Sequence, residues 1–266
     1  MLGVSTEFLL YLMHRPERSY RRFSLRWGKK IREIATPRVG LKLIQKWLSW
    51  HIQQAVNLPD CVHGFVPAHS TVSAAKEHTG KDWIVSMDIV DFFGTTSRES
   101  VRNALGTLGY PDEGADVCAA LTTLAGVLPQ GAPSSPLLSN LVFVPVDECL
   151  AGRAAAQGWS YTRYADDLIF SGMGEPPRIL PSLVGDAISL GGWRLNADKT
   201  TVQTRVTGVT VLGLSVWGVE PTLGKRKRRK LRLAKHLQGR EFTVEQERFF
   251  RSFQSFLGYA QMVTRG

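Results

Sequence analysis

The 266-residue chain carries 33 Lys and Arg against 23 Asp and Glu, which gives it a net charge of +10. This excess favours a polyanionic partner, either nucleic acid or an acidic membrane surface. The 3 cysteines are unevenly spaced and form no CxxC pair, which argues against a zinc site and a disulfide framework. The apolar run 8–13 is too short to cross a bilayer. We therefore expect a cytoplasmic protein that does not enter the membrane.

The first part of the chain is strongly basic. Two extended runs, 24–27 and 31–35, flank Gly28 and predict a hairpin with cations at its tip. Such a hairpin can fold over a triphosphate and contact its oxygens, and a solvated charged face is the alternative. Apolar residues then recur at helical spacing in 41–56, which predicts a helix whose stripe belongs to the core.

An apolar strand, 83–89, carries an acid near its end, Asp88, and the following run DFFGTT turns into a helix. Thr96 and Glu99 have the spacing of a capping box at the start of that helix. A carboxylate at the end of a strand can present a metal ligand, although such a residue is also a common cap.

The run LPQGAPSSP, 128–136, predicts a fixed loop that opens a further helix, where backbone N–H groups point outward. Ser135 can cap this helix and Pro136 fits its first turn. Pro145 should kink the helix or end its first half. An ordinary capped loop is the alternative.

The sequence YADD, 164–167, lies between two β-rich runs, 159–163 and 168–171, and predicts a hairpin. Neighbouring residues of a strand point to opposite sides, so only a tight turn brings Asp166 and Asp167 to one point. Two such acids repel each other unless a cation lies between them. A hard divalent cation is the natural guest, usually Mg²⁺ where phosphates are handled. A third acid would complete a two-metal site, whereas the dipeptide alone also fits a solvated turn.

Residues 225–235 carry eight cations and no acid, with Thr222 as a candidate cap. This run predicts a helix that grips a nucleic-acid backbone in a salt-dependent way, and a nuclear-localisation signal is the alternative. A last helix at about 243–262 has apolar residues at helical spacing, which predicts packing and not base contact.

In order and spacing, the strand-end Asp88 with Phe92 and Phe93, the LPQGAPSSP loop and the YADD turn resemble the blocks of reverse transcriptases, and most of all the retron type. Four more stretches resemble retron blocks: YRRFSLRWGKKIREIATP with LKLIQKWL, AAKEH at 74–78, LNADKT at 195–200, and VTG at 206–208. The chain departs from the pattern at Ala74, where Asn is usual, at Gly94, where Pro is common, and at Leu212, near a frequent Asn.

The resemblance implies an α+β fold, a right-hand polymerase. Fingers would take residues 1–85 with 105–140. The palm would take 86–104 and 141–220, as an antiparallel sheet backed by helices. A compact thumb would take 221–266.

The resemblance also assigns roles at the active site. Asp88, Asp166, Asp167 and the carbonyl of Ile89 would hold two Mg²⁺, with Mn²⁺ as a substitute. Lys199 would neutralise or protonate the leaving pyrophosphate, and Phe93 would exclude a 2′-OH. The remaining nucleotide contacts would come from Arg32, with Arg26 or Lys29 as a second clamp, and from Gln130, Gly131 and Ala165. RNA contacts would come from His78, Val206, Thr207, Gly208, Lys225, Arg226, Lys227, Arg228, Arg229, Lys230 and Arg232.

The implied function is RNA-directed DNA synthesis from dNTPs on a dedicated, structured non-coding RNA. The product would be a branched RNA-linked DNA (msDNA), made in a retron that defends against phage with an effector protein. Two alternatives stay open. One is another bacterial reverse transcriptase, either like those of group II introns or defence-associated without branched DNA; the short C-terminal part disfavours the intron type. The other is a non-catalytic RNA-binding scaffold.

Overall fold

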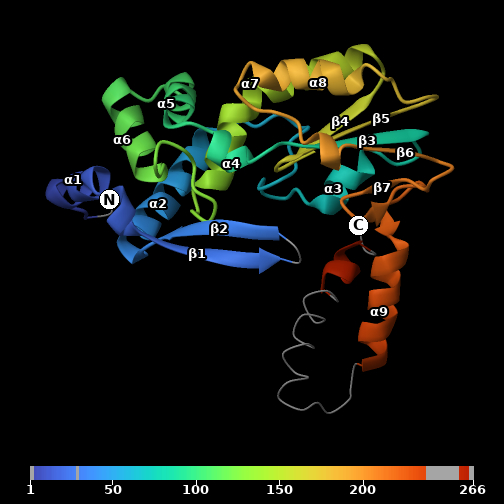
Figure 1. Ribbon diagram of the computed structural model, residues 1–266, viewed down its shortest axis with the longest axis horizontal. Helices are drawn as coiled ribbons and strands as arrows, with labels where there is room; N and C mark the ends of the chain where they lie inside the picture. Colours follow the sequence, from blue (N-terminus) through green and yellow to red (C-terminus); the bar gives the residue numbers. More distant parts are fainter. Residues whose placement is uncertain (1–2, 28–29, 238–257, 264–266) are drawn as a thin grey trace.

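The computed structural model of the chain describes residues 3–27, 30–237 and 258–263 (Figure 1). The elements follow in the order α1 (Thr6–His14), η1 (Pro16–Ser19), β1 (Tyr20–Trp27), β2 (Lys30–Pro37), α2 (Val39–Ala55), α3 (Thr71–Lys76), β3 (Trp83–Asp88), α4 (Phe92–Thr95), α5 (Arg98–Thr107), α6 (Asp112–Thr122), α7 (Ser135–Ala156), β4 (Ser160–Tyr164), β5 (Asp167–Gly172), α8 (Leu180–Ser189), η2 (Ala197–Lys199), β6 (Thr201–Thr204), β7 (Thr210–Val211), β8 (Leu214–Ser215), β9 (Thr222–Leu223) and α9 (Lys225–Leu237). Helices and antiparallel sheets together confirm the predicted α+β class.

The central sheet has four antiparallel strands in the order β4-β5-β3-β6. Side chains of β3 alternate between its two faces. Val85 and Met87 pack in one cluster with residues of α7 and α8, the helices that cover this face in Figure 1. Ile84 packs in a second cluster with residues of α3 and of the three-stranded sheet β7-β8-β9. Because both faces are covered, β3 is buried along nearly its whole length.

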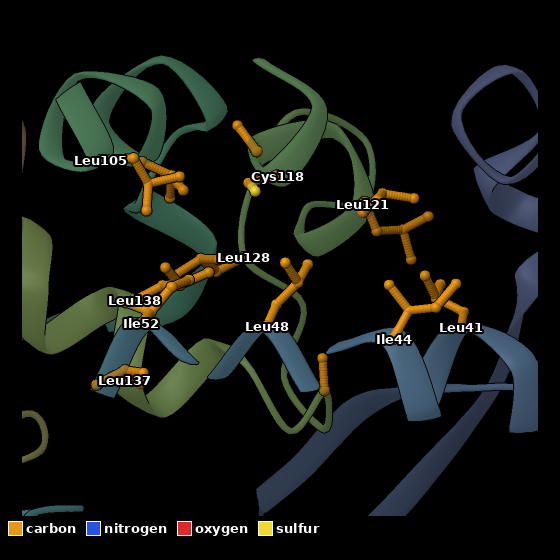
Figure 2. Close-up of a cluster of buried hydrophobic side chains, with 14 of the residues drawn as sticks. Leu41, Ile44, Leu48, Ile52, Leu105, Cys118, Leu121, Leu128, Leu137 and Leu138 are labelled. Carbon is orange, nitrogen blue, oxygen red and sulfur yellow. The ribbon is translucent and has the colours of Figure 1, made fainter. Parts of the chain in front are cut away.

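A second core lies in the helical half, where α2, α5, α6 and the first turns of α7 meet. The predicted stripe of α2 is confirmed as part of it, since Leu41, Ile44, Leu48 and Ile52 are all buried there. Figure 2 shows these side chains facing Leu121 and other apolar residues across the cluster. This core fixes the position of the loop that leads into α7.

The predicted basic hairpin is confirmed as β1 and β2, paired from Tyr20 with Pro37 to Trp27 with Lys30. Within the described residues these strands form a sheet of their own. Figure 1 shows the β1–β2 hairpin extending from the helical half toward the side of the molecule where α9 lies. The predicted YADD hairpin is likewise confirmed, as β4 and β5.

The predicted capping box at Thr96 is wrong. Ser97 caps α5 instead, since its hydroxyl accepts a hydrogen bond from the Ser100 N–H at 3.0 Å. Thr96 is buried, and its hydroxyl donates to the Phe92 carbonyl. The cap therefore sits one residue later, because the tertiary fold takes Thr96 into the interior.

Three other local predictions also differ from the structure. Ser135 is the first residue of α7 and donates its hydroxyl to the Pro129 carbonyl at 2.8 Å, so it ties the loop together and caps nothing. Helix α7 does not end at Pro145 but continues to Ala156, held by buried residues on both sides of the proline. Thr222 belongs to β9 and not to a helix cap.

The C-terminal helix predicted at about 243–262 lies mostly outside the described residues. Its described end, 258–263, is helical and places Ala260 and Val263 in the cluster beneath the small sheet. The Lys227 ammonium of α9 donates to the Tyr259 hydroxyl at 2.9 Å, which joins this segment to α9. No described helix is long and apolar enough to pass through a bilayer.

Candidate active site

Three carboxylates converge at one end of the central sheet. Asp88, the last residue of β3, lies opposite Asp167, the first residue of β5. The Ile89 N–H donates to the Asp166 carbonyl at 2.9 Å and ties the turn to the end of β3. Residues almost 80 positions apart in the sequence therefore meet because of the β3–β5 register.

The protein environment disfavours the charged forms of two of these acids. Burial, together with Asp166 and Asp88, raises the pKa of Asp167 to about 6. Burial also raises the pKa of Asp166, with a contribution from Asp88, while the charges of Lys199 and Arg32 act in the opposite direction. Carboxylates that repel each other in this way gain from a cation placed among them.

One cation of the chain already contacts this group. The Lys199 ammonium, at the end of η2, forms an ion pair with the Asp88 carboxylate. The backbone supports this arrangement, since the Asn196 N–H donates to the Asp88 carbonyl at 2.7 Å. Lys199 was predicted to act on pyrophosphate, and the structure brings it to the same point as the acids.

The residues suit divalent cations in their donor chemistry. Asp88, Asp166 and Asp167 supply carboxylate oxygens, the ligands that Mg²⁺ prefers, and Lys199 marks the place where positive charge is favourable. Within the described ranges, no three His, Cys, Asp or Glu side chains form a ready-made metal cage.

The turn that carries Asp166 and Asp167 is supported from inside the protein by Arg163 and Gly64, two residues that the sequence did not indicate. Ala165 has a left-handed φ of 57°, and the Arg163 guanidinium donates to its carbonyl at 3.2 Å. A Cβ on Gly64 would lie 2.4 Å from the Ala165 nitrogen, so only glycine allows this close approach.

Arg163 is itself fixed inside the protein. It forms an ion pair with Asp147 of α7 at 2.6 Å, and both side chains are fully buried. Its Nη1 also donates to the Asn140 side chain at 2.8 Å, and Asn140 donates to the Gly64 carbonyl. The signals in the sequence were an acid within the apolar run of α7 and an Arg within a β-rich strand.

The nucleotide-contacting residues predicted from the resemblance are only partly brought together. Arg32 of β2 and Gln130 line one hollow of about 490 Å³ between the hairpin and the segment before α7. Arg32 shares a face of the ribbon with Leu25, whereas Arg26 pairs with Ile31 on the other face. Arg26 is therefore not placed beside Arg32, and Lys29 lies outside the described residues.

Gly131 was predicted to contact the nucleotide, but in the structure it lies against residues of β2. Its φ is +116°, and a Cβ there would lie 2.7 Å from the Ile34 side chain and 3.2 Å from the Ala35 carbonyl oxygen. The Gln130 carbonyl accepts a hydrogen bond from the Ala35 N–H at 2.8 Å. Glycine is thus required here for docking the loop onto β2, a role that sequence reasoning did not foresee.

Phe93 is half-buried and contacts both hydrophobic cores. Its ring lies 6.4 Å from that of Phe65, which is exposed and has a left-handed φ of 62°. The Gly94 that follows replaces a common proline, and a Cβ there would lie 2.2 Å from an Asp91 carboxylate oxygen. Asp91 is exposed and its carboxylate can move away, so nothing in the structure explains this departure.

The predicted RNA contact of His78 does not agree with its position. The ring is fully buried, with Nδ1 2.7 Å from the Ser171 hydroxyl and Nε2 2.7 Å from the Thr162 hydroxyl. Burial lowers its pKa to about 3. His78 therefore joins β4 and β5 from inside the fold. Ala74, where Asn is usual, is buried in α3 in the same region.

The other predicted RNA contacts lie on the surface. Val206 is 96% exposed, and the Thr207 hydroxyl closes a turn by accepting from the Thr204 N–H at 3.0 Å. Gly208 has a φ of +86° with open space around it. On α9, Lys225, Arg228, Arg229, Lys230 and Arg232 are exposed, and Lys227 is half-buried. The side chain of Arg226 lies outside the described residues.

The chain matches the family model described as "Reverse transcriptase (RNA-dependent DNA polymerase)" over residues 25–216. It is 33% identical to the retron Mx65 reverse transcriptase of Myxococcus xanthus, over 98% of this chain and 66% of that protein. It is 30% identical to the retron Mx162 enzyme of the same organism, over 70% and 44%, and 28% identical to the retron Ec86 enzyme of Escherichia coli, over 94% and 80%. The chain thus spans about two thirds of the first relative and less than half of the second.

A solved structure of telomerase from Candida albicans, in complex with the TWJ fragment of telomeric RNA, has a similar fold. The TM-score is 0.55 at 10% identity, over 82% of this chain and 50% of that one. At this identity the similarity concerns the fold alone, and it agrees with the predicted right-hand polymerase.

Proposed function

Because the chain belongs to the reverse transcriptase family, we propose that it synthesises DNA from dNTPs on an RNA template. The observation that carries this proposal is the convergence of Asp88, Asp166 and Asp167 at one end of the β3–β5 pair. Divalent cations bound there, two Mg²⁺ or Mn²⁺ in their place, supply the charge that activates a primer hydroxyl and stabilises a transferring phosphoryl group.

The side chains around these acids have complementary roles. Asp88, Asp166 and Asp167, with the Ile89 carbonyl, would hold the cations, and the small side chain of Ala165 would leave room for the primer end beside them. Lys199, which is paired with Asp88, would provide positive charge, or a proton, for the departing pyrophosphate. Arg32 holds the triphosphate from the hairpin, and Gln130 contacts the nucleotide. Phe93 stacks beneath the sugar and rejects a 2′-OH.

We assign the parts of the chain as expected for a right-hand polymerase. Fingers take 1–85 with 105–140, the palm takes 86–104 and 141–220, and the thumb takes 221–266. Val101 and Leu105 of α5 pack with α2 and α6 in the helical core, so the end of the segment 86–104 packs against the fingers.

We further propose that the template is a dedicated, structured non-coding RNA and that the product is branched RNA-linked DNA. The similarity to three enzymes named as retron reverse transcriptases supports this. On this proposal the Val206-Thr207-Gly208 turn and the cations of α9 contact the RNA, and an effector protein acts with the enzyme in defence against phage.

The test is primer extension on a primed RNA template with dNTPs and Mg²⁺. Wild-type protein should extend the primer, whereas Asp166→Asn and Asp167→Asn should each lose most of this activity. Both variants should still bind the template, because only the carboxylates change. A wild-type protein that binds the template but extends no primer, with either Mg²⁺ or Mn²⁺, would support the non-catalytic scaffold instead.

A further inference from the structure

The outer face of α2 exposes large apolar side chains that are not needed to pack the helix against the core. The inner face buries five residues against the helical core, which suffices to hold the helix. The outer face exposes two tryptophans, Trp47 at 38% and Trp50 at 58%, together with Val39 and Leu43. Their spacing along 39–50 puts them on one side of the helix. Large exposed rings of this kind usually mark a binding surface.

The two indoles are held in an ordered cluster. The ring of His51 lies 4.2 Å from that of Trp47 and 4.7 Å from that of Trp50, with an edge-to-face orientation in both cases. Aromatic rings packed in this way lose little conformational freedom when a ligand stacks on them. The cluster is thus a preformed platform of flat rings.

The charged side chains beside this platform are all positive. Arg38, Lys42 and Lys46 are exposed at the start of α2 and along it. The helix sequence VGLKLIQKWLSWHIQQA contains no acid at all. Cations interleaved with exposed rings are the combination that binds single-stranded nucleic acid, in which phosphates meet the cations and bases stack on the rings. An acidic partner protein would also match the charge, and tryptophan is enriched at protein interfaces, so a protein occupant is an outcome of the binding test below.

We propose that the outer face of α2 binds single-stranded RNA, with bases stacked on Trp47 and Trp50 and phosphates held by Lys42 and Lys46. This surface lies on the helical half, whereas the three carboxylates lie at the end of the central sheet. It would therefore hold a part of the RNA that is not being copied. The inference rests on the proposed function, since that function makes RNA the partner.

Crosslinking locates the contact directly. A thiouridine-substituted oligouridine is irradiated with the wild-type protein in the presence of excess unlabelled primed template, which fills the catalytic cleft. Crosslinks should fall on Trp47 or Trp50 themselves, located by fragmentation of the tryptic peptide 47–76, because that peptide also contains Phe65 near Phe93. Crosslinks confined to other residues would overturn the proposal.

Binding measurements with variants test the energetics. Trp47→Ala with Trp50→Ala should weaken binding of the oligouridine about tenfold or more, and leave binding of a blunt RNA duplex nearly unchanged, because paired bases offer no free faces. Lys42→Glu with Lys46→Glu should weaken binding of both and lower the dependence of log Kd on log salt by roughly one to two.

Two control variants match these changes. Leu190→Ala removes an apolar side chain that is 89% exposed at the end of α8. Arg153→Glu with Arg178→Glu makes the same change in net charge on exposed positions near α7 and α8. If the charge control lowers the salt dependence as much as the α2 variant does, the effect belongs to net charge and the proposal fails.

Primer extension separates this proposal from the proposed function. At saturating concentration of a generic primed template, every α2 variant should extend it at the wild-type rate, because none of the substituted residues touches the three acids. If the wild type extends no template, the proposed function fails. If it extends the template but the tryptophan variant binds oligouridine as tightly as the wild type, the α2 proposal alone fails, and a protein partner becomes the better occupant.

Discussion

The Arg163 guanidinium lies 2.6 Å from the Asp147 carboxylate, and neither side chain is exposed to solvent. The same guanidinium donates to the Ala165 carbonyl, so the turn that bears the two adjacent acids rests on a buried ion pair. The Tyr161 hydroxyl donates to Asp147 as well, at 2.8 Å, which leaves the carboxylate well satisfied. The position of Asp166 and Asp167 thus depends on the Arg163–Asp147 ion pair, which is buried away from any substrate.

Breaking this pair should cost more stability than replacing it. Asp147→Asn leaves a buried guanidinium without its counter-charge and should lower the free energy of unfolding by about 3–5 kcal/mol. Arg163→Met with Asp147→Leu should recover much of that loss, since an apolar pair needs no desolvated charge. Urea denaturation measures both effects.

Primer extension by the same double variant separates support of the turn from overall stability. Folded Arg163→Met with Asp147→Leu should stay strongly impaired, because the Ala165 carbonyl loses its donor. Full activity in that variant would show that the pair contributes to folding only.

The buried His78 should make stability fall in acid. Its pKa in the folded protein is about 3, below the ordinary 6.5, so the unfolded chain takes up the proton first. The contribution is fully present above pH 6.5 and is lost as the pH falls toward 3, by up to about 1.4 kcal/mol per pH unit.

The comparison uses His78→Gln, which has no titrating ring, and His14→Gln on α1, which is exposed. Urea denaturation between pH 7 and pH 4 should give a flatter profile of unfolding free energy against pH for His78→Gln than for the wild type or for His14→Gln. Burial lowers the pKa of the nearby His63 to about 4, and its charge helps to lower the pKa of His78, so the difference between the wild type and His78→Gln includes this coupling. Parallel profiles would mean that His78 is protonated in the folded state as readily as in the unfolded chain.

Phe93→Ala should admit ribonucleotides. The half-buried ring contacts both cores, so its removal opens space beneath the proposed position of the sugar. Single-nucleotide incorporation should show a rise in the ratio of rNTP to dNTP use. Phe65→Ala, which removes the neighbouring exposed ring, is the matched control. An unchanged ratio would make Phe93 a packing residue.

Thr207→Ala with Gly208→Val should impair recognition of the cognate RNA. The substitution removes the hydroxyl that closes the turn and places a β-branched residue at a φ of +86°, which strains the backbone. Self-primed synthesis should be lost, whereas extension of a generic primed template should survive. Competition between the cognate RNA and an unrelated hairpin is the measurement, and equal losses on both would contradict a specific role.

Neutralising Arg228 and Arg229 of α9 should instead weaken binding of every template and flatten its salt dependence, since exposed cations contact phosphates without regard to sequence. Each variant thus provides the control for the other. The turn variant should lose binding of the cognate RNA only, whereas the α9 variant should lose binding of every template.

Sequence patterns predicted the regular elements well, because hydrophobic periodicity and hairpin signals are local. The hairpins β1–β2 and β4–β5 and the buried stripe of α2 all follow from spacing alone. Local signals failed where tertiary packing decides, as at Thr96, which is buried, and at Ser135, whose hydroxyl bonds the Pro129 carbonyl and does not cap α7.

Within the site, the sequence indicated the acids but not what supports them. Asp88, Asp166 and Asp167 stand out because they occur in the order and spacing of reverse-transcriptase blocks, since carboxylates at strand ends and in turns are common by themselves. Arg163 and Gly64 gain their roles only from contacts across the fold, with Asp147, Asn140 and Ala165. His78 was misjudged for the same reason, since its hydroxyl partners come from β4 and β5.

The two supports on α7, Asn140 and Asp147, lie about two helical turns apart and so reach Arg163 from the same side of the helix. Both side chains reach Arg163 only if they point in the same direction around the helix axis, so their spacing along α7 matters as well as their chemistry. One residue inserted or deleted between them would rotate one support by about 100° around the axis relative to the other. Over evolutionary time this stretch can therefore exchange side chains but not change its length. Insertions should accumulate elsewhere, in loops such as the one before α8.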